Sequence, residues 1–253
     1  MREFFFASFV STALIASGAS ALAQEENHGP FDVPTKVDVV KLAVAAGAED
    51  AAPAITCSRY PDFMVKEVDK GELGADKLAL LPKDAPCEET TAGETIIKDD
   101  MAGYYMEAKG NYVFFTGSDG YNGGMPFVVL DAKTQKHLFD DSFSLDEDVK
   151  TATVDGTKLT LTFKRVYTAD CSLYENKDGC SDKVKTATGL GKDVALPDCK
   201  PVYNSYIKEN PDYASDAKSD PSVMIYEATL LFDGTKAVVT PVSGTSASCL
   251  MAD

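Results

Sequence analysis

The chain has 253 residues, of which 44% are hydrophobic and none is tryptophan, and its formal net charge is −16 at pH 7. This charge argues against binding to nucleic acid or to anionic lipid head groups, because both repel a negative protein. It would attract a cationic protein, a cationic ligand or divalent cations, although acidity also serves simply to keep an exported protein soluble.

The first 23 residues are typical of a secretory signal peptide. A short basic start is followed by an apolar run, which ends in Ala21-Leu22-Ala23, the small-x-small pattern at which signal peptidase cleaves. We expect cleavage after Ala23, a periplasmic or secreted mature chain, and no membrane insertion after cleavage. The alternative is an uncleaved anchor, which the short apolar run and the cleavage pattern disfavour.

The next segment, 24–55, is predicted to be a flexible leader followed by a short helix or strand. Residues 24–35 are polar and interrupted by two prolines. Three valines between 37 and 44 recur at helical spacing with Gly47 as a helix end, while their β-branched side chains also suit a strand. A single β-rich domain over 56–253 is expected to follow.

The stretch from Cys57 to Cys87 is interpreted as one unit. Its YPDFMVKEV sequence favours a strand, and the leucines between 73 and 81 favour a short turn of helix before Pro82. The segment is small for a core of its own, so we expect a disulfide between its two cysteines to staple it. The loop-entropy model gives such a link roughly 3–4 kcal/mol.

Residues 103–168 and the C-terminal region favour β structure. KLTLTFKRVYT alternates apolar and polar residues for most of its length, as in a half-buried antiparallel strand. Asp155-Gly156 and Asp233-Gly234 are typical of tight hairpins. We predict a mainly β fold with minor α, an antiparallel sandwich or partial barrel, in which one sheet system contains the strands 112–116, 126–130, 158–168 and 223–232.

A Cys-rich insert is predicted over 169–221. It holds several prolines and shows no sustained period, so we expect it to be mostly irregular and stapled by disulfides. Within it, Lys177-Asp178-Gly179 resembles a hairpin turn.

The even number of cysteines in an exported chain predicts three disulfides and no free thiol. We favour Cys57–Cys87 and Cys171–Cys180 from their positions along the chain, which leaves Cys199 with Cys249, and the main alternative joins Cys171 to Cys199 and Cys180 to Cys249. A zinc site is disfavoured because no CxxC and no nearby histidine is present. The six predicted disulfide cysteines are Cys57, Cys87, Cys171, Cys180, Cys199 and Cys249.

The segment 110–132 carries the candidate binding site. Its SDGYNGG stretch lies between two predicted strands, where binding loops are common, and its glycines let the backbone approach a ligand. The alternative is a hairpin loop that needs positive φ angles. It lacks the GxxxxGK[ST] pattern of a phosphate loop. The predicted ligand-binding residues are Ser118, Asp119, Tyr121 and Asn122.

Neither a metal nor a cofactor is predicted. Both Gly-rich candidates for an EF-hand fail, because Tyr174 and Ser118 stand where the first carboxylate should be. The acidic run from Asp140 to Asp148 could hold calcium without that motif, but such runs are more often solvated turns.

Catalysis has few candidate groups. The chain has two histidines, and neither is accompanied by GxSxG. Carboxylates are abundant, so a two-carboxylate glycosidase stays an alternative, in which Tyr60, Tyr104, Tyr105, Tyr121 or Tyr167 would replace the usual tryptophan platforms. We therefore favour a protein without enzymatic activity.

The function predicted from the sequence is an exported, acidic binding or interaction protein of the cell envelope. In its charge and its SDGYNGG loop the chain resembles, as a class, the periplasmic lysozyme inhibitors, although no motif matches residue for residue. Those are acidic, disulfide-bearing β proteins that place a polar loop in the cleft of a cationic enzyme. The resemblance implies inhibition of a cationic cell-wall hydrolase as a second function, and a carboxylate-dependent hydrolase is the third.

Overall fold

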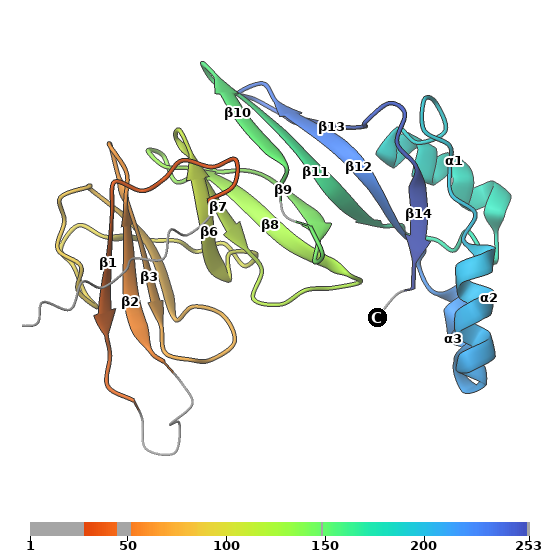
Figure 1. Cartoon of the computed structure of the whole chain (residues 1–253), viewed down its shortest axis with the longest axis horizontal. Helices are drawn as coiled ribbons and strands as arrows, with labels where there is room; N and C mark the ends of the chain where they lie inside the picture. The colour runs from red at the N-terminus through yellow and green to blue at the C-terminus, as the bar shows by residue number, and fades with distance from the viewer. Residues whose placement is uncertain (1–27, 45–51, 148, 252–253) are drawn as a thin grey trace, which may run out of the picture.

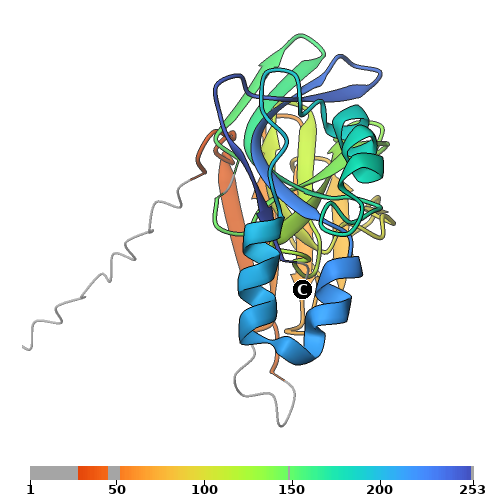
Figure 2. The same cartoon turned by 90° about the vertical axis from the view of Figure 1, so that its right-hand side faces the viewer.

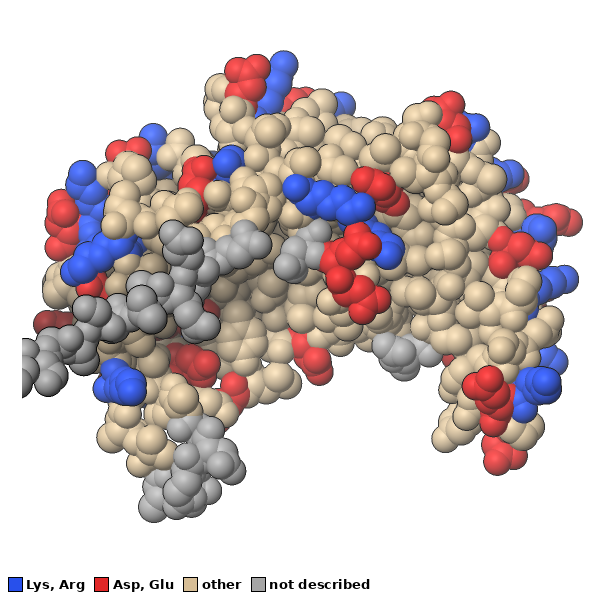
Figure 3. Space-filling model, viewed as in Figure 1, with Lys and Arg blue, Asp and Glu red and all other residues tan. Residues whose placement is uncertain are grey.

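The computed structural model describes residues 28–44, 52–147 and 149–251, and the predicted signal peptide lies outside them. In these ranges the chain forms two antiparallel sheets, with helices at one end (Figure 1). The five-stranded sheet and the helical end extend to the same side of the molecule, which gives it the shape of an arch (Figures 1 and 3). The mainly β fold with minor α is therefore confirmed.

The five-stranded sheet is built from consecutive hairpins and has the order β1-β2-β3-β4-β5. Of the two alternatives for the valine-containing segment, the structure has the strand. The expected turn of helix before Pro82 needs correction: Leu78, Leu80 and Leu81 lie in a strand, in which Leu78 and Leu80 are buried on one face and Ala79 and Leu81 on the other. The strands are β1 (Lys36–Lys41), β2 (Ala54–Arg59), β3 (Met64–Asp69), β4 (Lys77–Leu81) and β5 (Thr95–Ile96).

The larger sheet has nine strands in the described ranges, and all four predicted strands lie in it, as expected. Its main order is β13-β12-β11-β9-β8-β7-β6, with β10 paired to β11 and β14 paired to β12. The strands are β6 (Tyr104–Lys109), β7 (Tyr112–Thr116), β8 (Gly124–Asp131), β9 (His137–Ser144), β10 (Thr151–Asp155), β11 (Lys158–Thr168), β12 (Val223–Phe232), β13 (Ala237–Pro241) and β14 (Ala247–Leu250).

The larger sheet is strongly curled. The rings of Tyr112 on β7 and Phe232 on β12 lie 6.0 Å apart, although β8, β9 and β11 separate these strands in the sheet. Phe127 and Phe163 meet edge to face inside the curl, at 5.6 Å. The predicted partial barrel is thus formed by this sheet, whose concave face is filled by aromatic and leucine side chains.

The two sheets pack face to face over β6, β7 and β8. Val113, Phe115 and Val128 belong to one buried cluster with Val65, Leu78 and Leu80 of the smaller sheet. The opposite faces of β7 and β8 belong to the core inside the curl. Burial on both faces explains why YVFF and FVVL are continuous apolar runs instead of alternating ones.

The described part of the predicted leader is packed against the larger sheet. Phe31 is buried and its ring lies 5.0 Å from that of Phe114. The Asp32 amide donates to the Ala108 carbonyl at 2.9 Å, and His28 Nδ1 lies 2.9 Å from Glu107 Oε1. Residues 28–32 are thereby held to the larger sheet, whereas Thr35 donates to the Arg59 carbonyl of the smaller one.

The insert is mainly helical in its described residues, which corrects the expectation of an irregular segment. It contains α1 (Lys177–Thr188), α2 (Lys200–Glu209), a 3₁₀ turn (Pro211–Tyr213) and α3 (Ala214–Ser219), gathered at one end of the molecule (Figure 2). Lys177-Asp178-Gly179 is the first turn of α1 and not a hairpin, because Asn176 Oδ1 accepts from the Gly179 amide at 3.1 Å and caps the helix. Among the described residues, none of the helices has the length and apolarity needed to cross a membrane.

The favoured disulfide pairing is confirmed, and in the described part of the chain no cysteine is free. The Cα atoms of Cys57 and Cys87 are 6.0 Å apart, those of Cys171 and Cys180 5.6 Å, and those of Cys199 and Cys249 5.2 Å. The first bridge ties the segment after β4 to β2, the second ties α1 to the loop after β11, and the third ties the start of α2 to β14. Three such bridges are characteristic of proteins that fold outside the reducing cytoplasm.

Tyr203 of α2 offers a first stability test. Its side chain is fully buried, and among the described atoms its hydroxyl oxygen lacks a hydrogen-bond partner. Because an unsatisfied buried hydroxyl is costly, we expect Tyr203→Phe to raise the free energy of unfolding by about 1 kcal/mol. Chemical denaturation would measure this. The matched variant Tyr174→Phe, which removes a 2.9 Å bond to Asn204 Oδ1, should give no gain.

Candidate functional site

The predicted binding loop joins β7 to β8 and ends in a tight turn. Tyr121 and Gly124 form an antiparallel bridge, with Tyr121 N donating to Gly124 O at 2.7 Å and Gly124 N donating back at 2.9 Å. Between them, Asn122 and Gly123 both have positive φ, 52° and 72°, as a type I′ turn requires. The Asn-Gly pair is the sequence signal for this turn, and the turn fixes the direction of Tyr121.

The four predicted ligand-binding residues do not share one surface. Tyr121 is 63% exposed, whereas Asn122 is 1% exposed and its amide donates to Thr168 Oγ1 at 3.1 Å, so Asn122 positions the loop. Asp119 is exposed, and its carboxylate accepts from the Gly120 amide. Ser118 lies against Gly74 and Gly103, away from the turn. Whether any of them binds a ligand stays a prediction.

Tyr121 lines a cleft of about 320 Å³, in which residues from β8, β9 and β11 meet the loop. This volume lies at the lower end of the range of about 300–1,000 Å³ for small-ligand sites. The loop tip lies beneath the arch, near the C-terminal end of β14 (Figure 1), where a Cβ on Gly123 would approach Leu250 to 3.1 Å. The other lining residues are Met101, Pro126, Asp140, Asp141, Ser142, Arg165, Val166, Tyr167 and Thr168.

An ion pair lies at the base of this cleft. Arg165 Nε donates to Asp141 Oδ1 at 2.8 Å, and the side chains of the two residues are 14% and 6% exposed. An Nη1 hydrogen of Arg165 is donated to the Tyr226 hydroxyl at 2.8 Å, and the guanidinium lies 5.3 Å from the ring centre of Tyr167. Burial raises the pKa of Asp141 above its ordinary value, although Arg165 opposes that shift.

Sequence reasoning missed this pair, although a signal for Arg165 exists. Along β11, Arg165 continues the alternation of Leu159, Leu161 and Phe163, which point into the curl. A charged residue at an inward position of an alternating strand needs a buried partner. The strand pattern alone does not reveal that β9 supplies this partner.

A histidine and two carboxylates lie beside the rim of the cleft. His137 Nε2 is 3.1 Å from Asp140 Oδ1, and its Nδ1 is 2.7 Å from Asp99 Oδ2. Asp140, which lines the cleft, has a half-exposed side chain. Both ring nitrogens of His137 thus have carboxylates as their partners.

Two described residues of the acidic run considered for calcium, Asp141 and Glu147, form ion pairs with arginine or lysine. Asp141 pairs with Arg165, and Glu147 lies 3.3 Å from Lys164 Nζ and 3.4 Å from Lys150 Nζ. Among the described residues, no group of three or more His, Cys, Asp or Glu side chains is arranged to hold a metal ion.

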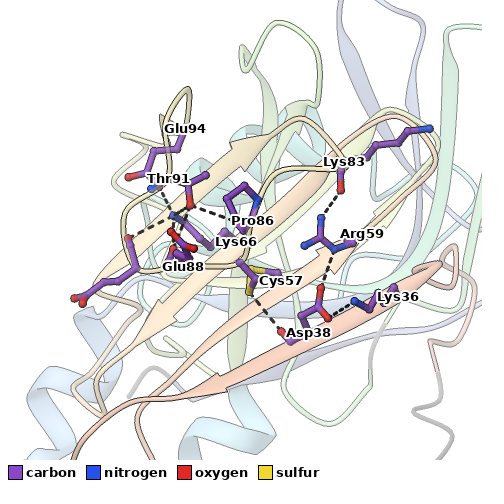
Figure 4. Close-up of a disulfide and its surroundings, with 12 residues drawn as sticks. Lys36, Asp38, Cys57, Arg59, Lys66, Lys83, Pro86, Glu88, Thr91 and Glu94 are labelled. Carbon is purple, nitrogen blue, oxygen red and sulfur yellow. Dashed lines mark hydrogen bonds and ion pairs between the residues drawn. A yellow bond between two sulfur atoms is a disulfide. The ribbon is translucent and has the colours of Figure 1, made fainter.

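A second polar cluster lies on the outer face of the smaller sheet, near the Cys57–Cys87 bridge (Figure 4). Lys66 is completely buried there, and its ammonium donates to the Glu94 carboxylate and, at 3.0 Å, to the Glu88 carbonyl. Residues 82–94, which we call the strap, thus cover this face. All these contacts hold the strap to the sheet, so we assign the cluster a structural role.

Comparisons with known proteins give no relative: no family model, no curated protein and no solved structure matches the chain.

Other described cavities have similar volumes of about 290–350 Å³. The cleft at the β7–β8 loop differs from them by joining an exposed aromatic ring to a buried ion pair. It is therefore the candidate functional site.

Proposed function

We propose that the protein is an exported binding protein of the cell envelope, periplasmic or secreted, whose ligand site is the cleft beside the β7–β8 loop. The observation that carries this proposal is the placement of Tyr121. A rigid two-residue turn holds this exposed ring at a cleft that also contains Arg165 and Asp140. Exposed aromatic side chains on rigid turns are typical anchors of binding sites.

Export is supported by the signal-like N-terminal sequence together with the three disulfides.

A role in binding is supported over catalysis by the side chains at the cleft. Asp140 and Asp141 are neighbours on a strand, so their side chains leave it on opposite faces and do not flank one bond as glycosidase carboxylates do.

Substitution of the loop tests this function. We expect Asp119→Ala/Tyr121→Ala to weaken binding at least about tenfold, or 1.4 kcal/mol, while the melting temperature stays nearly constant. The reason is that both side chains are exposed and contribute little core burial. The purified chain would be immobilised, and the material it retains from an envelope extract of the source cell would be quantified at several protein densities.

Tyr213 provides a matched control. It is 59% exposed, close to the 63% of Tyr121, and lies in the helical end of the molecule. Tyr213→Ala should retain the same material as the unmodified chain. Equal retention by the loop variant, or a loss of melting temperature without a loss of binding, would show that the loop is only a structural turn.

A cationic partner is the second candidate, and inhibition of a cationic cell-wall hydrolase is its most specific form. The observation that favours it is the net charge of −16, with exposed Asp119 and Asp146 beside exposed Tyr121 and Leu145. On the face shown in Figure 3, however, acidic and basic side chains are interspersed. Retention of a basic protein that weakens steeply as salt rises would support this candidate, because salt screens charge attraction.

A further inference from the structure

The smaller sheet ends in a strand whose outer edge is unpaired. Strand β1 is the outermost strand of this sheet (Figure 1), and in the described ranges only β2 pairs with it. The Leu42 amide donates to the Pro53 carbonyl at 2.9 Å, so, by the alternation of an antiparallel ladder, the even-numbered residues of β1 direct their backbone groups toward β2. The amides and carbonyls of Val37, Val39 and Lys41 therefore point away from the sheet.

Apolar side chains are concentrated along the same edge. Five valines between residues 33 and 44 are exposed, and three of them, Val37, Val39 and Val40, belong to β1 itself. The strap lies on the face that carries Asp38, whereas Val37 and Val39 point to the opposite face. An open strand edge with exposed β-branched side chains is a template for pairing with another strand, and proteins usually shield such edges.

A second copy of the chain supplies a matching edge. Around a two-fold axis at Val39, this residue faces its own copy and Val37 faces Lys41 of the other copy, so the outward groups of both strands can form about six backbone hydrogen bonds. This register alone pairs the three outward-facing residues among themselves. The register in which Val37 faces Val39 would place Asp38 opposite its own copy, and like charges directly opposite one another destabilise a sheet.

The charges on β1 are compatible with this contact. Lys36 Nζ lies 2.6 Å from Asp38 Oδ1, and Arg59 Nε lies 2.8 Å from Asp38 Oδ2, so the carboxylate in each copy already has cationic partners. The net charge of −16 acts over a longer range and opposes association of two copies. Because salt screens this repulsion, added salt should strengthen the association.

We propose that β1 pairs antiparallel with β1 of a second copy, which joins the two smaller sheets into one continuous sheet across a two-fold axis. A single six-residue strand gives a small contact compared with the roughly 1,200–2,000 Å² of stable interfaces, so the dimer is weak and forms at high protein concentration. The inference is independent of the proposed function, because it uses no residue of the cleft.

Sedimentation velocity tests the dimer. The full chain with its disulfides intact would be measured from about 10 µM to about 1 mM, at low and at high salt. We expect a concentration-dependent dimer that Val39→Lys weakens at least about tenfold, because two ammonium groups would face each other across the axis. Val238→Lys is the matched control and should associate like the unmodified chain. Val238 is 45% exposed, against 60% for Val39, and lies on β13, the outermost strand at one end of the larger sheet.

Cysteine variants test the register. In the proposed pairing, Val39→Cys places two thiols across the axis with their Cα atoms about 5.5 Å apart, which suits a disulfide. The two copies of Val37→Cys would be about 13 Å apart along the strands. Oxidation in air should therefore trap a covalent dimer of Val39→Cys and not of Val37→Cys, and the reverse result would contradict the register.

Three results would overturn the proposal: a chain that stays monomeric at every concentration, a dimer that Val39→Lys leaves unchanged, or an equal loss of association in Val238→Lys. A second variant guards against misfolding. Val39→Pro removes an outward-facing amide and no hydrogen bond to β2, so it should weaken the dimer as well. Equal near-ultraviolet circular dichroism of the variants and the unmodified chain would show that the variants are folded.

Discussion

Replacing Arg165 with methionine is expected to lower the free energy of unfolding by about 3–5 kcal/mol, because it leaves the Asp141 carboxylate buried without its cation. Methionine keeps much of the volume of the arginine stem, so the loss reports mainly on charge. Urea denaturation with the disulfides intact would measure the change.

Two further variants distinguish the effect of the two buried charges on stability from the effect of side-chain packing. Arg165→Met/Asp141→Asn removes both charges, and we expect it to recover most of the lost stability. Lys183→Met removes a pair in which both side chains are mostly exposed, and its effect should lie within experimental error. If the double variant is no more stable than Arg165→Met alone, the ion pair is not the source of the loss.

The pH dependence of the Arg165→Met deficit has a definite sign. Burial raises the pKa of Asp141 in the folded protein while Arg165 lowers it, so removing the arginine raises this pKa further. A carboxyl with a raised folded-state pKa destabilises the fold at neutral pH, and the protein regains that stability as pH falls through the folded-state pKa. The deficit should therefore be largest near neutral pH and should shrink on acidification.

The success of the sequence prediction follows from how each element is buried. The strand at 158–168 could be predicted because one face is buried and the other is polar over most of its length, which gives a clear period of two. The disulfides could be paired because Cys57–Cys87 lie apart from the other four cysteines and Cys171–Cys180 lie close together, which leaves Cys199 with Cys249. The helices of the insert were missed, because α1 is only weakly amphipathic and a disulfide joins it to the loop after β11.

The candidate site was predicted in part. The position of the loop could be found from its Gly-rich sequence, and ligand binding by its residues stays a prediction. The burial of Asn122 and its bond to Thr168 of β11 could not be predicted from the loop sequence alone. Arg165 and Asp141 are 24 residues apart and meet through the pairing of β11 with β9, which local patterns do not specify. A contact between residues that strand pairing brings together therefore cannot be predicted from local sequence segments.

Lys66 provides the second large effect, on the smaller sheet. Lys66→Met is expected to lower the free energy of unfolding by about 3 kcal/mol, because Glu94 and the Glu88 carbonyl lose a buried ammonium. The loss should lie at the lower end for buried pairs, since Lys77 Nζ, 3.1 Å from Glu94 Oε1, still compensates that carboxylate. Urea denaturation measures the loss, and faster hydrogen exchange of the Thr91 amide would show that the strap has loosened.

Matched variants and pH complete this test. Lys70 pairs with Glu89 of the same strap at 2.9 Å, but both side chains are about half exposed, so Lys70→Met should change stability little.

Burial opposes the ionisation of Glu94, but hydrogen bonds from Lys66 and Lys77 outweigh it and hold its pKa below the ordinary value. The stability from this carboxylate is present above its unfolded-state pKa and is lost as pH falls through its folded-state pKa. The gap between the unmodified chain and Lys66→Met should therefore narrow in acid, and a gap that stays constant down to low pH would contradict an ionic role for Lys66.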